Sequence, residues 1–224
     1  MRFDIEWRDI LTAAGIKRFH MVECAHRTGE FRGRSDAECD TVARKLIAVI
    51  KLRARLGIVA SIREADFEEK DPGWGYVFCL SWCLSGVSAW IHGQKDFPSK
   101  ISYFFEAGHD RQGLANKTMN SFQQSPILME GMRYHSHSFI SKEDALPIQA
   151  ADLLAWQWHR EWVNQFGTIR RSRRRDLDSL LRLPHIGCHM TPNNLEELLR
   201  TDSASEAGRR FAYINPVYGP EGID

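Results

Sequence analysis

The stretch Pro147-Ile148-Gln149-Ala150-Ala151-Asp152-Leu153-Leu154-Ala155-Trp156-Gln157-Trp158-His159-Arg160-Glu161-Trp162 predicts a helix, because a proline precedes a run of strong helix formers. At about 100° per residue, one arc of this helix is apolar and consists of Ile148, Ala151, Leu154, Ala155, Trp158 and Trp162. The opposite face carries Gln149, Gln157, Arg160 and Glu161. We therefore expect the apolar arc to face the protein core.

Asp152 lies at the edge of this arc. An ionised carboxylate that turns toward a core without a partner is strongly destabilising, so Asp152 must be paired, hydrogen-bonded or bound to a cation. Two interpretations follow. Asp152 is either a structural residue, which forms a salt bridge with an arginine or caps a neighbouring element, or a functional carboxylate.

The composition is that of a soluble globular protein, with 43% hydrophobic and 26% charged residues in a chain of 224. We expect a single α/β domain over residues 1–201 and an irregular tail over residues 202–224, which is rich in glycine, proline and small polar residues. The five cysteines lack the spacing of a disulfide framework, and no signal peptide is evident. These features predict a cytoplasmic protein.

Residues 74–91 contain no charged side chain and resemble a membrane span in composition. Glycines and serines dilute their hydropathy, and the uncharged length falls short of the ~20 apolar residues that a span needs. We expect a buried core helix here and no membrane association.

Helices and strands alternate along the predicted chain. The expected helices cover residues 4–14, 36–56, 75–92, 114–122, 147–162 and 192–200, and the expected strands cover residues 16–24, 58–62, 101–106, 134–139 and 185–190. The helix that follows residue 35 has a specific start signal, because Ser35 and Glu38 have the spacing of a capping box. This alternation is typical of an α/β fold.

Two carboxylates are candidates for a catalytic metal site. Glu106 ends a predicted strand, and α/β sheets place ligands at the carboxyl ends of their strands. Asp152 lies in the first turns of a later helix. If the fold brings them together, they could bind Mg²⁺ or Mn²⁺, which prefer oxygen ligands, and could serve in phosphodiester hydrolysis.

Three motifs together resemble the domain of unknown function 3800 family. They are Pro147-Ile148-Gln149-Ala150-Ala151-Asp152-Leu153-Leu154-Ala155, Phe104-Phe105-Glu106-Ala107-Gly108-His109-Asp110 and Phe19-His20-Met21-Val22-Glu23. The resemblance implies a ribonuclease H-like fold, in which helices flank a mixed sheet, and acidic residues that bind a divalent metal. It matches Glu106 and Asp152 to two of those acidic positions.

The chain departs from that family at its amino end, where relatives carry a strand with an Asp-Glu-Ser-Gly-like motif. By this comparison the chain is N-terminally truncated and short of one metal ligand. It is then either part of an active enzyme or a degenerate member without catalysis, and Glu23 or Asp110 could substitute for the missing carboxylate. His20 is a candidate proton carrier beside the site, although a structural histidine has the same sequence signal.

A run of five arginines is the strongest local charge in a chain whose formal net charge is only +1. The residues are Arg170, Arg171, Arg173, Arg174 and Arg175, and we expect them to contact nucleic-acid phosphates or to form a solvated helix start. The sequence thus predicts a metal-dependent nuclease. The alternatives are a non-catalytic nucleic-acid or protein interaction module of a mobile or defence element, and a small-molecule metallohydrolase. The oligomeric state stays open.

Overall fold

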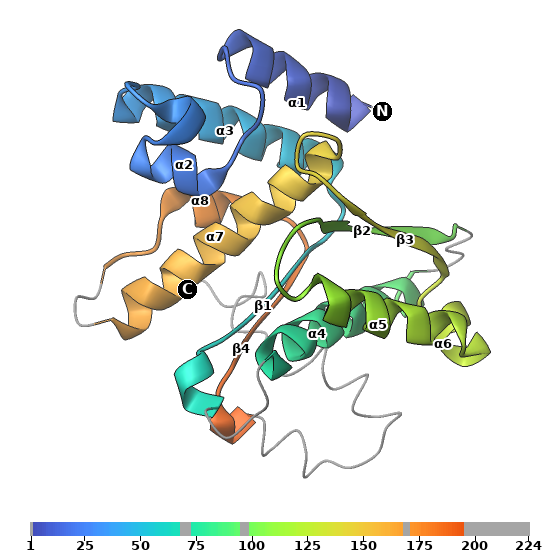
Figure 1. The fold of residues 1–224 in the computed structure, drawn as a ribbon. Coiled ribbons are helices and arrows are strands. Elements are labelled where there is room, and N and C mark those ends of the chain that lie inside the picture. The colour runs from blue at the N-terminus through green and yellow to red at the C-terminus, as the bar shows by residue number, and fades with distance from the viewer. Residues whose placement is uncertain (1, 68–72, 95–98, 168–170, 195–224) are drawn as a thin grey trace. The chain divides into compact units, whose positions relative to one another are not determined.

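The computed structural model describes residues 2–67, 73–94, 99–167 and 171–194. The chain divides into two compact units (Figure 1). Unit 1 comprises Met1–Gly57 and Ile140–His185, and unit 2 comprises Ile58–Phe139 and Ile186–Asp224. The expected single domain over residues 1–201 stays a prediction, and the expected tail lies outside the described residues. The described chain is mixed α/β, as the sequence predicts.

Unit 1 is built from helices that surround one apolar core. Its elements are α1 (Arg2–Ala13), α2 (Met21–His26), the short 3₁₀ helix η1 (Gly29–Phe31), α3 (Asp36–Arg53), α7 (Leu146–Phe166) and α8 (Arg175–Leu180). α1 packs along α3, and α7 contacts α1, α2, α3 and α8. Trp7, Phe19, Phe31, Leu46 and Leu153 are fully buried in this core.

The predicted capping box of α3 is confirmed. The Ser35 hydroxyl accepts a hydrogen bond from the Glu38 N–H at 3.3 Å, and the Glu38 carboxylate accepts the Ser35 N–H at 2.8 Å. α3 ends at Arg53, before the expected stop at Gly57, because Ala54 already has extended backbone. Local signals therefore place the start of this helix more accurately than its end.

The predicted strand over residues 16–24 is wrong, because Met21 already begins α2. The reason lies in side chains of α7 that bind the backbone of this segment. The Phe19 N–H donates to the Gln149 Oε1 at 2.9 Å, and the Met21 N–H donates to the Asp152 Oδ2 at 3.1 Å. These donors are therefore satisfied without a neighbouring strand.

The predicted buried arc of α7 is confirmed only in part, since Ile148 and Trp158 are buried, and the helix begins beside Pro147 as expected. Ala151 and Ala155 are exposed, whereas Gln149 and Gln157 are completely buried. Both amides are hydrogen-bonded inside unit 1. Gln149 accepts the indole N–H of Trp7 at 2.9 Å, and Gln157 accepts the Nε–H of Arg174 at 3.1 Å. Burial of a polar side chain is tolerated when its hydrogen bonds are made, so the hydrophobic pattern alone misplaces this face.

Unit 2 combines helices with two small parallel sheets. Its elements are β1 (Gly57–Ile62), the 3₁₀ helix η2 (Glu64–Phe67), α4 (Trp74–His92), β2 (Ile101–Glu106), α5 (Gln112–Gln123), α6 (Pro126–Gly131), β3 (Tyr134–Ile140) and β4 (His185–Met190). One sheet pairs β1 with β4 and the other pairs β2 with β3. The four strands and the helices predicted at 75–92 and 114–122 are confirmed. The helix predicted over 192–200 is seen at residues 192–194, and the remainder lies outside the described residues.

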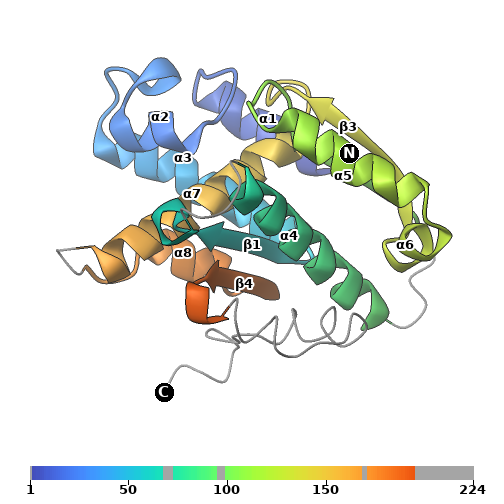
Figure 2. The same cartoon turned by 60° about the horizontal axis from the view of Figure 1, so that its bottom comes forward.

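α4 contributes to both cores of unit 2, and Figure 2 shows it beside β1 and β4. Its Trp82 is buried in one cluster with Cys188 and Met190, and its Leu84 is buried in another with Met119. Within the described ranges, α4 is the one helix long and apolar enough to cross a membrane, yet only 22% of its apolar window is buried. Length and composition fit a span and a core helix alike, so the expected lack of membrane association stays a prediction.

Candidate functional site

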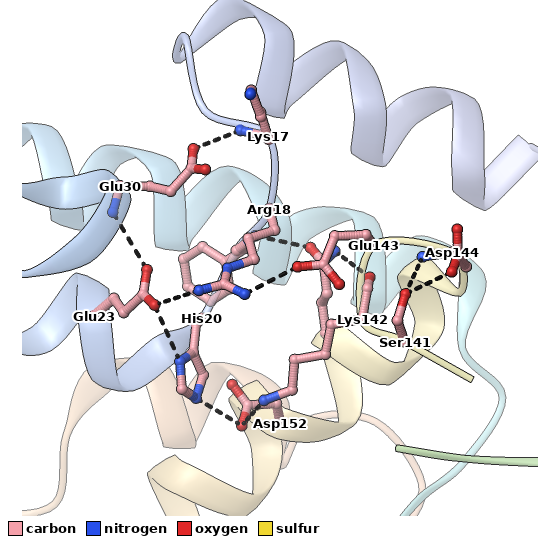
Figure 3. Close-up of polar contacts among 12 residues, drawn as sticks. Lys17, Arg18, His20, Glu23, Glu30, Ser141, Lys142, Glu143, Asp144 and Asp152 are labelled. Carbon is pink, nitrogen blue, oxygen red and sulfur yellow. Dashed lines mark hydrogen bonds and ion pairs between the residues drawn. The ribbon is translucent and has the colours of Figure 1, made fainter. Parts of the chain in front are cut away.

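Charged side chains from three segments of unit 1 converge on His20 (Figure 3). The turn before α2 supplies Arg18 and His20, α2 supplies Glu23, and α7 together with the loop before it supplies the rest. We call this group the His20 cluster, and its members are Arg18, His20, Glu23, Lys142, Glu143 and Asp152. Two of them, His20 and Asp152, are predicted site residues.

Asp152 has partners on both carboxylate oxygens. Its Oδ2 accepts the Met21 N–H at 3.1 Å, and its Oδ1 lies 3.2 Å from the Lys142 ammonium and 3.6 Å from the His20 Nε2. The side chains of Lys142 and Asp152 are only 10% and 19% exposed. The requirement that this carboxylate be paired is thus met by a lysine and a backbone N–H.

The His20 ring lies between two carboxylates. Its Nδ1 is 3.7 Å from the Glu23 Oε1, its Nε2 is 3.6 Å from the Asp152 Oδ1, and its side chain is 29% exposed. Both separations are longer than hydrogen bonds, so neither carboxylate is hydrogen-bonded to the ring in this geometry.

Both carboxylate oxygens of Glu23 accept hydrogen bonds, Oε1 from Arg18 and Oε2 from the Glu30 N–H. Burial acts to raise the pKa of Glu23, but the Glu30 N–H and the guanidinium of Arg18 outweigh it and lower that pKa. Arg18 reaches Glu23 at 2.8 Å and Glu143 at 2.9 Å, and its hydrogen bond to Glu143 is the main reason that its own pKa is raised. Glu23 is therefore a fixed negative charge beside His20.

Glu106 ends β2, as predicted, and is exposed in unit 2. Asp152 belongs to unit 1, so a shared site of Glu106 and Asp152 stays a prediction. The same holds for Asp110 as a substitute ligand, since it also belongs to unit 2. Glu23, the other suggested substitute, lies in the His20 cluster, but the imidazole of His20 separates it from Asp152.

The donor set of the His20 cluster does not fit Mg²⁺ or Mn²⁺ as it is arranged. Asp152 is already balanced by the Lys142 ammonium, and Glu23 is balanced by Arg18. A hard divalent cation needs several oxygen ligands that converge on one point. Among the residues that the structure describes, no group of three or more His, Cys, Asp or Glu side chains could hold a metal ion.

Two members of the arginine run make structural contacts within unit 1. Arg173 Nε donates to the buried Glu161 at 3.1 Å, and Arg174 Nε donates to Gln157 at 3.1 Å. Arg171 and Arg175 are exposed. Arg170 lies outside the described residues. The expected phosphate contacts are therefore best served, within the described chain, by the two exposed arginines.

Sequence reasoning missed Lys142 and Arg18. Lys142 had a usable signal, because only a short connection joins the predicted strand at 134–139 to the helix of Asp152. Sequence reasoning also missed a polar pair in unit 2. The Ser61 hydroxyl lies 2.9 Å from the His189 Nδ1, and the two residues come from the neighbouring strands β1 and β4. Burial lowers the pKa of His189 to about 4. No sequence signal reveals this pair, because residue spacing does not give the register between distant strands.

Comparison with known proteins yielded no matching family model, no matching curated protein and no matching solved structure. The function is therefore inferred from the chemistry of the His20 cluster.

Proposed function

We propose that this protein hydrolyses phosphodiester bonds in nucleic acid and that the His20 cluster is its active site. The observation that carries this proposal is the position of His20, a partly exposed imidazole between Glu23 and Asp152 with two cations beside it. An imidazole that lies between two carboxylates and has positive charge nearby suits the cleavage of an anionic ester by general acid–base catalysis.

His20 acts in this proposal as the general base or acid. Asp152, whose Oδ1 lies 3.6 Å from the His20 Nε2, would orient the ring once the two atoms come within hydrogen-bonding distance, as carboxylate partners of catalytic histidines do. Asp152 can do so because the Met21 N–H and Lys142 hold it in place. Glu23 provides a second negative charge on the other side of the ring.

Arg18 is the phosphate-binding candidate near the ring. Arg18 is partly exposed, and a guanidinium offers several donors to a phosphate in a planar arrangement. The exposed Arg171 and Arg175, which also belong to unit 1, add positive charge for the rest of a nucleic-acid strand.

A metal-dependent form of the same function follows from the family resemblance. The helix that carries Asp152 resembles the most specific motif of the domain of unknown function 3800 family, and this resemblance implies a ribonuclease H-like sheet. In this form Glu106 and Asp152 would hold Mg²⁺ or Mn²⁺. It requires Glu106 and Asp152 to bind the same metal ion and Lys142 to release Asp152.

A cleavage assay tests the proposal. Labelled single- and double-stranded DNA and RNA are incubated with the full chain in Mg²⁺, in Mn²⁺ or in EDTA. We expect His20→Gln to lower the rate about 100-fold or more, the usual contribution of a general acid or base. His26→Gln is the matched control, because His26 is an exposed histidine on α2. Cleavage that survives both His20→Gln and Asp152→Asn would overturn the assignment of the site.

The second candidate function is a non-catalytic interaction module. It is favoured by the complete pairing of Asp152, which joins α2 to α7 through the Met21 N–H. This candidate predicts that none of the four substrates is cleaved, with or without metal, and that Asp152→Ala lowers the melting temperature while nucleic-acid or protein binding persists in the folded fraction.

A further inference from the structure

Lys142 is fixed at its main chain as well as at its side chain. Its carbonyl accepts the Gln149 amide at 2.7 Å, and Gln149 is itself completely buried and bonded to Trp7 and Phe19. The Lys142 side chain is 10% exposed and ends 3.2 Å from the Asp152 Oδ1. The ammonium is therefore delivered to Asp152 by a backbone that the core of unit 1 holds in position.

The charges of the His20 cluster are nearly balanced without any added ion. Lys142 and Arg18 carry two positive charges, and the three carboxylates carry three negative charges. Asp152 and Glu23 each already have a cation beside them, so little uncompensated negative charge is left for a divalent cation to neutralise.

We propose that the Lys142 ammonium is the resident cation of Asp152 and occupies the position that a divalent metal would need on this carboxylate. Breaking such a half-buried pair leaves an uncompensated charge, so a metal would have to compete with a cation that is already bound. The inference deepens the proposed function, on which its consequence for cleavage rests: the His20 cluster then works without a metal on Asp152.

Titration of the full chain with MnCl₂, followed by the electron paramagnetic resonance signal of free Mn²⁺, tests this inference without any cleavage. In the wild-type background, we expect Asp152→Asn to leave the affinity for Mn²⁺ unchanged. Lys142→Met should raise the affinity for Mn²⁺ by about tenfold or more, the scale on which groups around a site alter metal affinity. Adding Asp152→Asn to Lys142→Met should remove that gain, and Lys142→Arg, which keeps the charge, should behave as the wild type.

Two results would overturn the inference. One is wild-type Mn²⁺ binding that falls about tenfold or more in Asp152→Asn, and the other is a Lys142→Met variant with unchanged affinity. Melting curves establish that each variant is folded, and Lys142→Gln, which keeps a polar end group, replaces Lys142→Met if that variant does not fold. Cleavage that EDTA abolishes, together with Mn²⁺ binding through Asp152, would remove the inference and keep the function. If no substrate is cleaved but Mn²⁺ binding follows the expected pattern, the proposed function is removed and the inference about Lys142 stands.

Discussion

Two features require a glycine at position 29, namely its left-handed backbone and the Glu23 carboxylate that lies against it. Its φ is +53°, and a Cβ at this position would lie 2.2 Å from the Glu23 Oε2. We expect Gly29→Ala to destabilise the protein by more than the roughly 1 kcal/mol that the left-handed conformation alone costs, and to displace Glu23 from His20. Urea unfolding and the cleavage rate measure the two effects.

Gly33 provides the matched control for this prediction. Its φ is +82°, and nothing lies within 4 Å of a Cβ added there. Gly33→Ala therefore reports the backbone strain alone. An equal decrease in stability in Gly29→Ala and Gly33→Ala would show that the contact with Glu23 contributes nothing.

His189 makes the stability of the protein sensitive to acid. Burial lowers its pKa to about 4 from an ordinary value of 6.5, and the nearby Asp66 only partly opposes this effect. Because the folded state favours the neutral ring, this stabilisation is complete above pH 6.5 and is lost as the pH falls toward 4. The loss amounts to about 3 kcal/mol at most.

The measurement is urea unfolding across this range of pH, with His189→Gln as the comparison. The variant should lose less stability than the wild type between pH 6.5 and pH 4, since glutamine does not titrate. Parallel curves for the two proteins would contradict the role of His189.

At the scale of elements, local signals in the sequence predict well, and side-chain contacts between distant segments are what they miss. The capping box of α3 and the aromatic strand β2 depend on neighbouring residues, and both are confirmed. The strand expected at residues 16–24 fails because Gln149 and Asp152 bind its backbone from more than a hundred residues away. Nothing in the local pattern reveals those partners.

The buried face of α7 leads to a prediction about Gln149. Its amide accepts from Trp7 and Phe19 and donates to the Lys142 carbonyl, so Gln149→Leu would leave two buried groups and one partly buried group without these partners. We expect a loss of about 3 kcal/mol or more in the free energy of unfolding. His159→Leu, at an exposed position of the same helix, should change it by less than about 0.5 kcal/mol.

Chemical denaturation of the two variants decides this point. If Gln149→Leu is as stable as His159→Leu, the buried amide is not what joins α7 to the start of α2. A loss restricted to Gln149→Leu would also explain why the face of α7 that carries Gln149, opposite the predicted arc, is buried in unit 1.

At the scale of the whole molecule, the alternation of helices and strands predicts the α/β class, but it does not predict which strands pair. β1 pairs with β4, which lies more than a hundred residues further along the chain, and no local feature of either strand specifies the other. The site shows the same division. The sequence indicates Asp152 and His20 separately, but their approach to one another and to Lys142 depends on how α2 and α7 pack.

The salt dependence of nucleic-acid binding tests the arginine run as a feature of the molecular surface. Replacement of the exposed Arg171 and Arg175 by glutamine should weaken binding and reduce the slope of log affinity against log salt by about 0.9 for each phosphate that an arginine no longer neutralises. The melting temperature should not change. Arg174→Gln should lower the melting temperature instead, because Arg174 bonds to the buried Gln157 and lies over the Trp156 ring.

Fluorescence anisotropy with a labelled oligonucleotide, measured over a range of salt concentrations, gives the slope, and scanning fluorimetry gives the melting temperature. An unchanged slope in the Arg171→Gln/Arg175→Gln variant would remove these two arginines from the nucleic-acid surface. The cleavage assay on His20→Gln would still stand as a separate test, because His20 contributes to chemistry and the two arginines contribute to binding. Comparing the two sets of variants therefore separates where a strand binds from where it is cut.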